Sequence, residues 1–277
     1  MAVSIDKARD FLYRHGTLFE RALFAYLFDG GSPERVQQII LCYKNADNGF
    51  GHAFEHDLSA PQSNPLALEY LLSTVKYTGV PIGDVLAGTS DWVEAQMDEN
   101  GFLKNPPQTH DYPLAPWWQE TGGQNLPDAI VGTLTYFGQA RPSLIEKTKK
   151  WVEVNHTLDS IRANEWLFMA YHAVEFFFTV ENFPNLEAYQ QATIDNVIAC
   201  AEKAPENQYY SLLPFVPSPD SIITKALPDG LLNRYLDHLE TAQQEDGSWL
   251  DQHNLPQWYP MVTTNVLLGL RRHGRLL

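Results

Sequence analysis

Cysteine is scarce in this chain. Its two cysteines, Cys42 and Cys200, lie far apart and neither belongs to a CxxC pair. We therefore expect a fold without disulfides, as is typical of a protein in the reducing cytoplasm. The HExxH and CxxC spacings of common zinc sites are also missing, so the sequence predicts neither a metal nor another cofactor.

Basic residues and long apolar runs are lacking too. The 19 Lys and Arg residues face 34 Asp and Glu residues, and the formal net charge of −15 repels a nucleic-acid backbone. The most apolar stretch, residues 166–180, is interrupted by His172 and Glu175 and is too short to cross a bilayer. Residues 1–11 lack the apolar core of a signal peptide. We expect a cytoplasmic protein with no nucleic-acid partner and no transmembrane segment.

One kind of turn, in contrast, occurs three times. The segments NADNGFG (residues 45–51), MDENGFL (97–103) and QEDGSWL (244–250) each place an acidic or amide turn and a glycine just before an aromatic residue. The glycines are separated by close to whole multiples of roughly fifty residues, which is typical of a repeated helical unit.

A polar loop, a proline and an apolar helix closed by a glycine follow these turns. In the first copy Asn64 is the expected N-cap, Pro65 the first helical residue and Gly79 the left-handed stop. The other predicted helices of this kind lie between Pro127 and Gly138 and between Pro260 and Gly274.

Hydrophobic periodicity predicts the remaining helices. We place them at about residues 4–14, 17–28, 33–45, 83–98, 142–154, 161–180, 186–203, 219–226 and 229–244. Without a convincing strand pattern, these paired helices predict an all-α single domain, residues 1–277, in which six helical hairpins close into an (α/α)6 barrel, or toroid. An open helical solenoid is the structural alternative.

The segment QQEDGSW, residues 243–249, resembles the QW repeat of squalene and hopene cyclases, and similar glycine-aromatic turns occur in protein prenyltransferase β-subunits. The resemblance implies an α/α toroid in which Gln243 and Trp249 tie successive hairpins together, with Phe50 and Phe102 as weaker equivalents. It also implies an isoprenoid-like substrate in a central cavity lined by aromatic residues. The DxDD motif that protonates the alkene in squalene cyclases does not occur here.

In such a toroid the loop before each inner helix lies at one end of the barrel. The first loop, residues 51–64, contains His52, Glu55, His56 and Asp57. A carboxylate beside a histidine can hold or relay a proton near neutral pH. Asp57 is nearest the inner helix and is therefore our first candidate for the catalytic acid, with His56 as its partner. The alternative is that the carboxylates satisfy loop backbone groups while the histidines are solvated.

The second loop, residues 103–126, adds His110 and Asp111 as further catalytic candidates. Long structured loops in compact domains tend to be functional. Tryptophans can stack on sugar rings, cover an isoprenoid chain or stabilise a carbocation. The substrate-binding candidates of this loop are Trp117, Trp118 and Glu120.

The third loop, residues 249–260, repeats the combination of an acidic residue with a histidine. Its substrate-binding candidates are Asp251, His253, Trp258 and Tyr259. Glu165 and Glu175 are additional candidates from an inner helix, with Arg162 and His172 as alternative ion-pair partners. Ring closure should bring the three loops to the same end of the barrel.

These features favour an enzyme or binding protein, similar in plan to terpene cyclases and prenyltransferases, that transforms or binds a small apolar isoprenoid-like molecule by acid/base chemistry. Two other functions stay open. A carbohydrate-active barrel, either a glycosidase or a lyase, would use Asp57 with Asp111 or Glu120 as its two carboxylates. A non-catalytic interaction module would leave the cavity unused.

Overall fold

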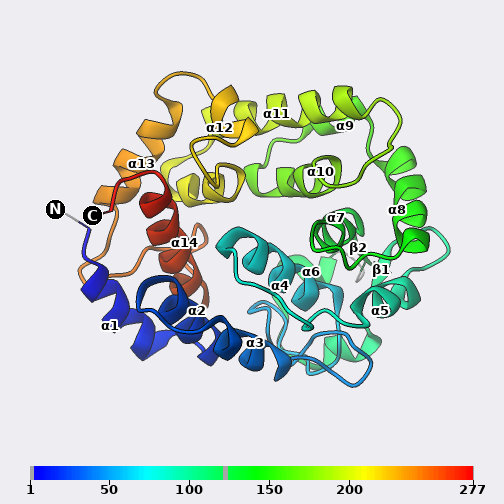
Figure 1. Ribbon diagram of the computed structural model, residues 1–277, viewed down its shortest axis with the longest axis horizontal. Helices are drawn as coiled ribbons and strands as arrows, with labels where there is room; N and C mark the ends of the chain where they lie inside the picture. Colours follow the sequence, from blue (N-terminus) through cyan, green and yellow to red (C-terminus); the bar gives the residue numbers. More distant parts are fainter. Residues whose placement is uncertain (1–2, 121–123, 277) are drawn as a thin grey trace. The chain divides into compact units, whose positions relative to one another are not determined.

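The computed structural model describes residues 3–120 and 124–276, and the side chains of residues 119, 120 and 124 lie outside this description. The chain is mostly helical, as the sequence predicts, and the described part contains one short two-stranded sheet (Figure 1). No helix among these residues is long and apolar enough to span a membrane.

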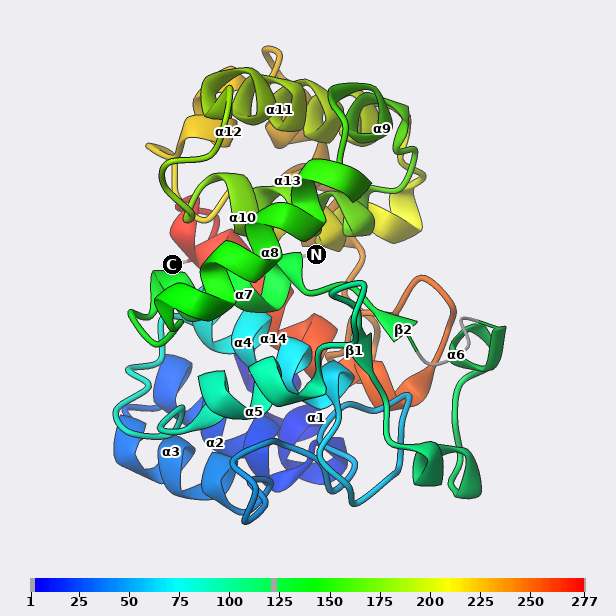
Figure 2. The ribbon, with the colours of Figure 1, turned by 90° about the vertical axis from the view of Figure 1, so that its right-hand side faces the viewer.

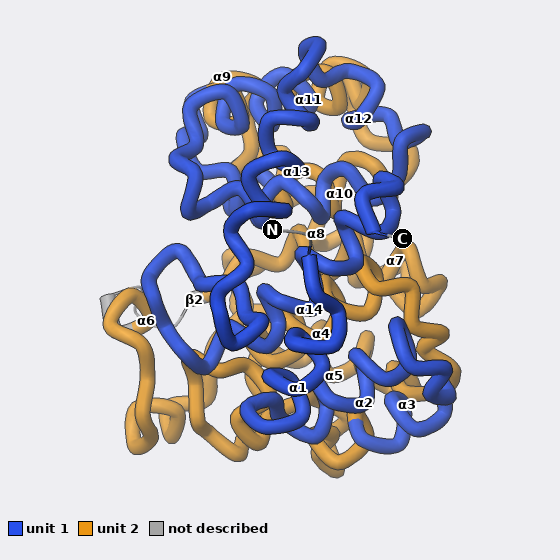
Figure 3. Tube along the Cα trace, turned by 90° about the vertical axis from the view of Figure 1, so that its left-hand side faces the viewer, with its two compact units in different colours: residues 1–39, 163–170, 194–277 blue, residues 40–162, 171–193 orange. Residues whose placement is uncertain are grey.

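The chain divides into two compact units, coloured separately in Figure 3. Unit 1 comprises residues 1–39, 163–170 and 194–277, and unit 2 comprises residues 40–162 and 171–193. The single domain expected from the sequence stays a prediction.

Unit 1 centres on α14 (Tyr259–Arg272), most of whose residues are buried. This helix contacts α1 (Ile5–His15), α2 (Leu18–Phe28) and the 3-10 helix η3 (Glu206–Phe215). The other elements are η2 (Leu167–Met169), α12 (Ile222–Ala226), α13 (Leu231–Thr241) and η4 (Pro256–Trp258). The division from unit 2 falls within α3 (Pro33–Leu41) and α11 (Leu186–Lys203), and the terminal residues Ala163 of α9 (Leu158–Ala163) and Ala170 of α10 (Ala170–Phe177) also belong to unit 1.

Unit 2 contains α7 (Asp128–Tyr136), which contacts both α4 (Pro65–Thr78) and α8 (Pro142–Asn155). Its other elements are α5 (Thr89–Gln96), β1 (Leu103–Lys104), η1 (Pro107–Asp111), α6 (Pro116–Glu120), β2 (Gln124–Asn125), α9 (Leu158–Ala163) and α10 (Ala170–Phe177). The strands β1 and β2 pair antiparallel near α6, with Leu103 opposite Asn125 (Figure 2). Aromatic side chains of α8 and α10, among them Trp151 and Phe176, form an apolar core in this unit.

Local capping explains why several helices begin and end where the sequence predicts. The Asn64 side chain accepts a hydrogen bond from the N–H of Ala67 at 2.9 Å, and Pro65 is the first residue of α4. Gly79 then ends the helix with a left-handed φ of 74°. Gly138 and Gly274 also adopt positive φ after their helices, which confirms these predicted stops.

Two predicted helices differ most in extent from the observed ones. The helix expected at 83–98 begins only at Thr89, because Gly88 is its N-cap with a φ of 76°. The helix expected at 161–180 is interrupted: the Asn164 side chain accepts a hydrogen bond from the N–H of Trp166 at 3.2 Å and donates to its carbonyl at 3.0 Å. This local turn separates α9 from α10. The 3-10 helix η3 was not predicted at all.

The three repeated turns share one backbone conformation. Each turn is counted from the residue whose N–H donates to the carbonyl four residues later: Asn45 to Gly49 at 2.9 Å, Asp98 to Phe102 at 2.9 Å, and Gln244 to Ser248 at 2.8 Å. The fourth residue of each turn has a left-handed backbone: Asn48, Gly101 and Gly247. The turn that the sequence repeats therefore has the same backbone conformation in all three places, whereas the helical repeat of roughly fifty residues stays a prediction.

This conformation corrects the alignment of the turns. The left-handed residue of the first turn is Asn48 and not Gly49, because asparagine tolerates that backbone region. The residue two positions later is buried in every copy: Phe50, Leu103 and Trp249. The equivalent of Trp249 in the second turn is thus Leu103, and our assignment of Phe102 to that place is wrong.

Gln243 and Trp249 hold the third turn against neighbouring elements of unit 1. Gln243 accepts a hydrogen bond from the N–H of Ser4 at 2.8 Å and donates to the Ser4 carbonyl at 2.9 Å. The indole N–H of Trp249 donates to the carbonyl of Leu239 at 2.8 Å. The turn therefore ties the residue before α1 to the C-terminal part of α13.

Candidate functional site

The first loop, residues 51–64, folds back on itself in unit 2. His52 and Ala53 both have left-handed backbones, with φ of 58° and 56°. Their N–H groups donate to the carbonyls of Pro61 at 3.3 Å and Ala60 at 3.2 Å on the returning part of the loop. The two ends of the loop are thereby joined to each other by backbone contacts.

Aromatic rings join this loop to α4. The ring of Phe54 lies 5.5 Å from that of Tyr70 and 4.4 Å from that of Tyr43, measured between centroids. The imidazole of His56 lies 5.7 Å from the same Tyr70 ring. These contacts bring the residues of the loop next to Glu69, the helical neighbour of Tyr70.

Glu55 is buried in this loop, with 7% of its surface exposed. Its Oε2 accepts a hydrogen bond from the N–H of Asp57 at 2.8 Å. Burial raises the pKa of Glu55 to about 8, and the negative charges of Asp57 and Glu69 add to the effect. The carboxyl group is therefore protonated at neutral pH and able to donate a proton.

The raised pKa predicts a pH-dependent stability. Folded Glu55 keeps its proton up to about pH 8, whereas in the unfolded chain it loses the proton near its ordinary value of 4.5. Between these values Glu55 binds more protons in the folded state than in the unfolded state. The contribution of Glu55 to the stability of the fold therefore falls as pH rises, by up to about 1.4 kcal/mol per pH unit. The variant Glu55→Gln lacks this pH-dependent contribution to stability. Urea denaturation at about pH 5 and about pH 8 should show a smaller stability loss for Glu55→Gln than for the natural chain; equal losses would contradict the buried acid.

The first and second loops lie together in unit 2, as the repeat phase predicts. The N–H of Ala115 donates to the Asp57 carbonyl at 2.8 Å, and Ser59 donates to the carbonyl of Pro113 at 3.0 Å. Apolar side chains cover this contact: Leu58, Ala60 and Leu66, packed with Leu114 and Trp118. Asp57 and His56 themselves are half-buried.

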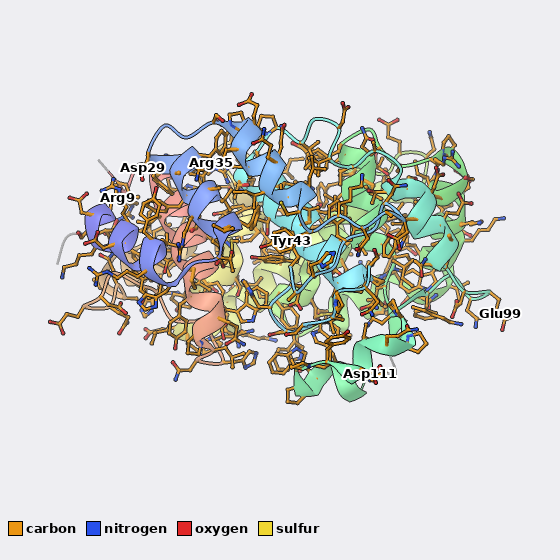
Figure 4. The ribbon with its side chains drawn as sticks, turned by 90° about the horizontal axis from the view of Figure 1, so that it is seen from below. Arg9, Asp29, Arg35, Tyr43, Glu99 and Asp111 are labelled. Atoms are coloured by element: carbon orange, nitrogen blue, oxygen red, sulfur yellow. The ribbon has the colours of Figure 1, made fainter. Side chains whose placement is uncertain are left out.

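The other candidates of these two loops are less enclosed. His110 and Asp111 are exposed on η1, where Figure 4 labels Asp111. Trp117 keeps 38% of its surface exposed. Glu120 ends α6, and its side chain lies outside the described residues.

His52 is exposed, and its Nε2 lies 2.9 Å from Oδ1 of Asn45. It borders a hollow of about 310 Å³. The remaining lining residues are Asn45, Asp47, Pro61, Gln62 and Ser63. This surface hollow does not include Glu55.

The candidates of the third loop, together with Glu165, belong to unit 1. Asp251 accepts hydrogen bonds from the Tyr210 hydroxyl at 2.9 Å and from the N–H of His253 at 2.8 Å. His253 is exposed, and the Tyr259 hydroxyl bonds to Asn254. Trp258 is half-buried and Glu165 is exposed. Arg162 pairs with Asp159, and not with Glu165 as the sequence suggested.

A buried group that the sequence analysis missed lies deeper in unit 2. Asp128, the fully buried first residue of α7, accepts hydrogen bonds from two imidazoles. Its Oδ1 lies 2.7 Å from Nδ1 of His172, and its Oδ2 lies 2.7 Å from Nε2 of His156. The second ring nitrogen of His172 lies 3.8 Å from Oε1 of Glu69. Four titratable side chains thus form one series, His156–Asp128–His172–Glu69.

Close packing of two helices supports this series. A side chain on Gly132 of α7 would overlap the backbone carbonyl of Glu175 on α10, so glycine permits the close approach of the two helices. Glu175 pairs with Lys76 of α4 and accepts a hydrogen bond from the Thr133 hydroxyl at 3.0 Å. The pairing of Glu175 with His172 that the sequence suggested is therefore replaced by one with Lys76.

Asp128 and His172 stabilise each other's charged form. Burial alone would raise the pKa of Asp128, but the charge of His172 and hydrogen bonds from both histidines hold it far below its usual range. Burial would lower the pKa of His172, yet the charge of Asp128 outweighs it and the pKa is raised. Burial raises the pKa of Glu69 to about 7 against the opposing charge of His172. Asp128 is accordingly an anion at neutral pH, and His172 is stabilised as a cation.

No spacing motif marks these residues, since each comes from a different element. The available signal is a titratable residue within an otherwise apolar helix, such as Glu69 in LALEYLL, or His172 with Glu175 in MAYHAVEFF. Among the described residues, no group of three or more His, Cys, Asp or Glu side chains is arranged to hold a metal ion.

No known protein family matches the sequence, and no curated protein or solved structure matches the chain. Any inference about function therefore rests on the residues and their geometry alone.

Proposed function

We propose that this chain is a terpene cyclase-like enzyme that transforms a small, apolar, isoprenoid-like molecule, with Glu55 as the proton donor. The observation that carries this proposal is a carboxyl group that is buried, protonated at neutral pH and flanked in the chain by Phe54 and His56, which both contact the ring of Tyr70. Asp57, the first candidate from the sequence, supplies a backbone N–H to Glu55, so the acid role passes to Glu55.

The proposal includes the (α/α)6 toroid. Its support is the repeated turn, which has the same hydrogen bond and a left-handed residue at the same position in all three copies, and the helices that begin at or next to a proline. Small-angle scattering should then report a compact particle, whereas an elongated one would favour the open solenoid.

The residue before Glu55, Phe54, belongs to an aromatic cluster that suits a cationic intermediate. Phe54, Tyr43 and Tyr70 form a continuous aromatic cluster, with ring centroids 4.4 and 5.5 Å apart. The faces of such rings attract positive charge, most strongly where water is excluded. A carbocation formed beside this cluster would be stabilised without a mobile counter-ion.

The reaction begins with proton transfer from Glu55 to a carbon–carbon double bond. The O–H bond of Glu55 breaks, a C–H bond forms, and the positive charge stays on the substrate. Loss of a proton from a neighbouring carbon to a base then forms a new double bond. The product is an isomer of the substrate, and neither an oxidant nor a reductant is consumed.

Deuterium labelling tests this chemistry. The chain is incubated with farnesol or squalene in D₂O, and products are analysed by mass spectrometry. We expect isomers that carry one deuterium, and a loss of labelled product of about 100-fold or more in Glu55→Gln, because the amide cannot act as the acid. The exposed Glu99, labelled in Figure 4, provides the matched control Glu99→Gln, which should keep full activity. Undiminished labelling by Glu55→Gln, or no labelled product from the natural chain, would contradict the proposal.

A carbohydrate is the second candidate substrate, because Trp117 stays 38% exposed and offers a flat face for a sugar ring. Quenching of tryptophan fluorescence by soluble oligosaccharides, lost in Trp117→Ala, would favour this alternative. Absence of both activities would favour the interaction module.

A further inference from the structure

Glu69 and His172 face each other next to the proposed acid. Glu69 on α4 and His172 on α10 approach to 3.8 Å between Oε1 and Nε2, and their side chains are only 14% and 8% exposed. The negative charge of Glu69 contributes to the raised pKa of Glu55, so the two carboxyl groups are near enough to interact. The proposed function uses Glu55 alone and leaves this second pair without a role.

Asp128 fixes the direction in which the His172 ring points. Its Oδ1 is 2.7 Å from Nδ1 of His172, which leaves the opposite nitrogen, Nε2, directed at Glu69. The second oxygen of Asp128 accepts a hydrogen bond from His156 at 2.7 Å, so the carboxylate is held from both sides. Asp128 has no exposed surface, and its negative charge also favours the protonated form of Glu69.

The charged groups around His172 come from three helices. They are Asp128 on α7, Glu69 on α4 and Glu175 on α10, and all three carboxylates favour the protonated imidazole. Glu175 is itself paired with Lys76, which reduces the effect of its charge on His172. The ring of Tyr171, whose centroid lies 4.2 Å from the imidazole, adds no charge. A cationic His172 is thus the consequence of its surroundings.

We infer that Glu69, held beside His172, is the base that completes the reaction, and that Asp128 is the positioning residue that keeps His172 oriented and protonated. This inference rests on the proposed function. A C–H bond of the substrate cation breaks, its proton forms an O–H bond on Glu69, and the electron pair becomes the new double bond. The proton then passes to the Glu55 carboxylate, which restores the acid and leaves Glu69 ionised beside cationic His172.

An NMR titration tests the positioning role without any substrate. The His172 imidazole signal is assigned by its loss in His172→Gln and followed against pH in the natural chain, Asp128→Asn and His156→Gln. We expect a titration midpoint above the ordinary value of about 6.5 in the natural chain and a fall to that value or below in Asp128→Asn. His156→Gln keeps a donor to Asp128, so its midpoint should fall less. Asp84→Asn, an exposed aspartate of unit 2, is the matched control and should leave the midpoint unchanged.

The pH dependence of turnover tests the base. Loss of the His172 charge raises the pKa of Glu69, so the acidic limb of the rate profile should move to higher pH in His172→Gln, which keeps the opposing charge of Asp128. A merely structural role would lower the rate at every pH and leave the limb in place.

The outcomes separate this inference from the proposed function. A His172 midpoint at or below the ordinary value in the natural chain, or one that both variants leave unchanged, overturns the inference whether or not turnover is seen. Should Asp128→Asn fail to fold, His156→Gln and the natural chain still decide it. Absence of labelled product from the natural chain, with the expected His172 titration, overturns the proposed function and the base role of Glu69 but leaves the positioning by Asp128 standing.

Discussion

Replacing Trp249 with alanine should lower the free energy of unfolding by about 3 to 5 kcal/mol. The indole is 2% exposed, and its N–H donates to the Leu239 carbonyl at 2.8 Å. The backbone N–H of the same residue donates to the Thr263 hydroxyl at 3.0 Å, so the third turn is joined to both α13 and α14. Alanine leaves a cavity and removes the donor that the Leu239 carbonyl uses. Urea denaturation followed by circular dichroism measures the loss.

Trp117→Ala is the matched control for this change. The same deletion is made there from a side chain that keeps 38% of its surface exposed, so the expected loss is below about 1 kcal/mol. Equal losses in the two variants would contradict the view of Trp249 as a buried tie between elements of unit 1.

The helices could be predicted from the sequence because their ends are local. Asn64, Pro65 and Gly79 fix the bounds of α4 through contacts within a few residues, so the signal is present in the chain itself. The second loop, with its short strands and helices, carries no comparable periodicity and was left without elements. The break before α10 was missed because a single asparagine, Asn164, competes with the helix through its side chain.

Residue identity alone aligns the three repeated turns incorrectly. Gly49, Gly101 and Gly247 align by residue type, yet the backbone aligns Asn48 with the last two. Asparagine can adopt the left-handed region that glycine adopts freely, so the conformation is kept while the letter changes. The buried partner of the turn shifts accordingly from Phe102 to Leu103.

The candidate site was found only in part. Glu55 was among the predicted residues because its loop is rich in titratable groups, although burial rather than position selected it over Asp57. The series around Asp128 could not be found, since it joins residues 44 positions apart in sequence, Asp128 and His172, across a packing contact. Such contacts depend on how the helices pack against each other. This packing is determined by all the core side chains together and not by any local segment of sequence.

Replacing Asp128 with asparagine should lower the free energy of unfolding by about 3 to 5 kcal/mol near pH 5.5. Asp128 is fully buried, and both of its oxygens accept hydrogen bonds from imidazoles at 2.7 Å. An asparagine has one acceptor oxygen, so its amide group would meet one of the two histidines as a second donor. Cationic His172 would also lose its buried counter-charge. Urea denaturation measures the loss, and the exposed Asp84→Asn should change stability by less than about 0.5 kcal/mol.

The pH dependence of this loss identifies its cause. The pKa of Asp128 is lowered on folding, so its contribution is present above the ordinary aspartate value of about 3.9 and disappears as pH falls through the folded value. The pKa of His172 is raised on folding, so its contribution is present below about 6.5 and disappears as pH rises through the folded value. The difference between the natural chain and Asp128→Asn should therefore be largest between these two ordinary values and shrink on both sides. A difference that stays constant with pH would mean that asparagine disturbs packing alone and that no ionised Asp128–His172 pair stabilises the folded chain.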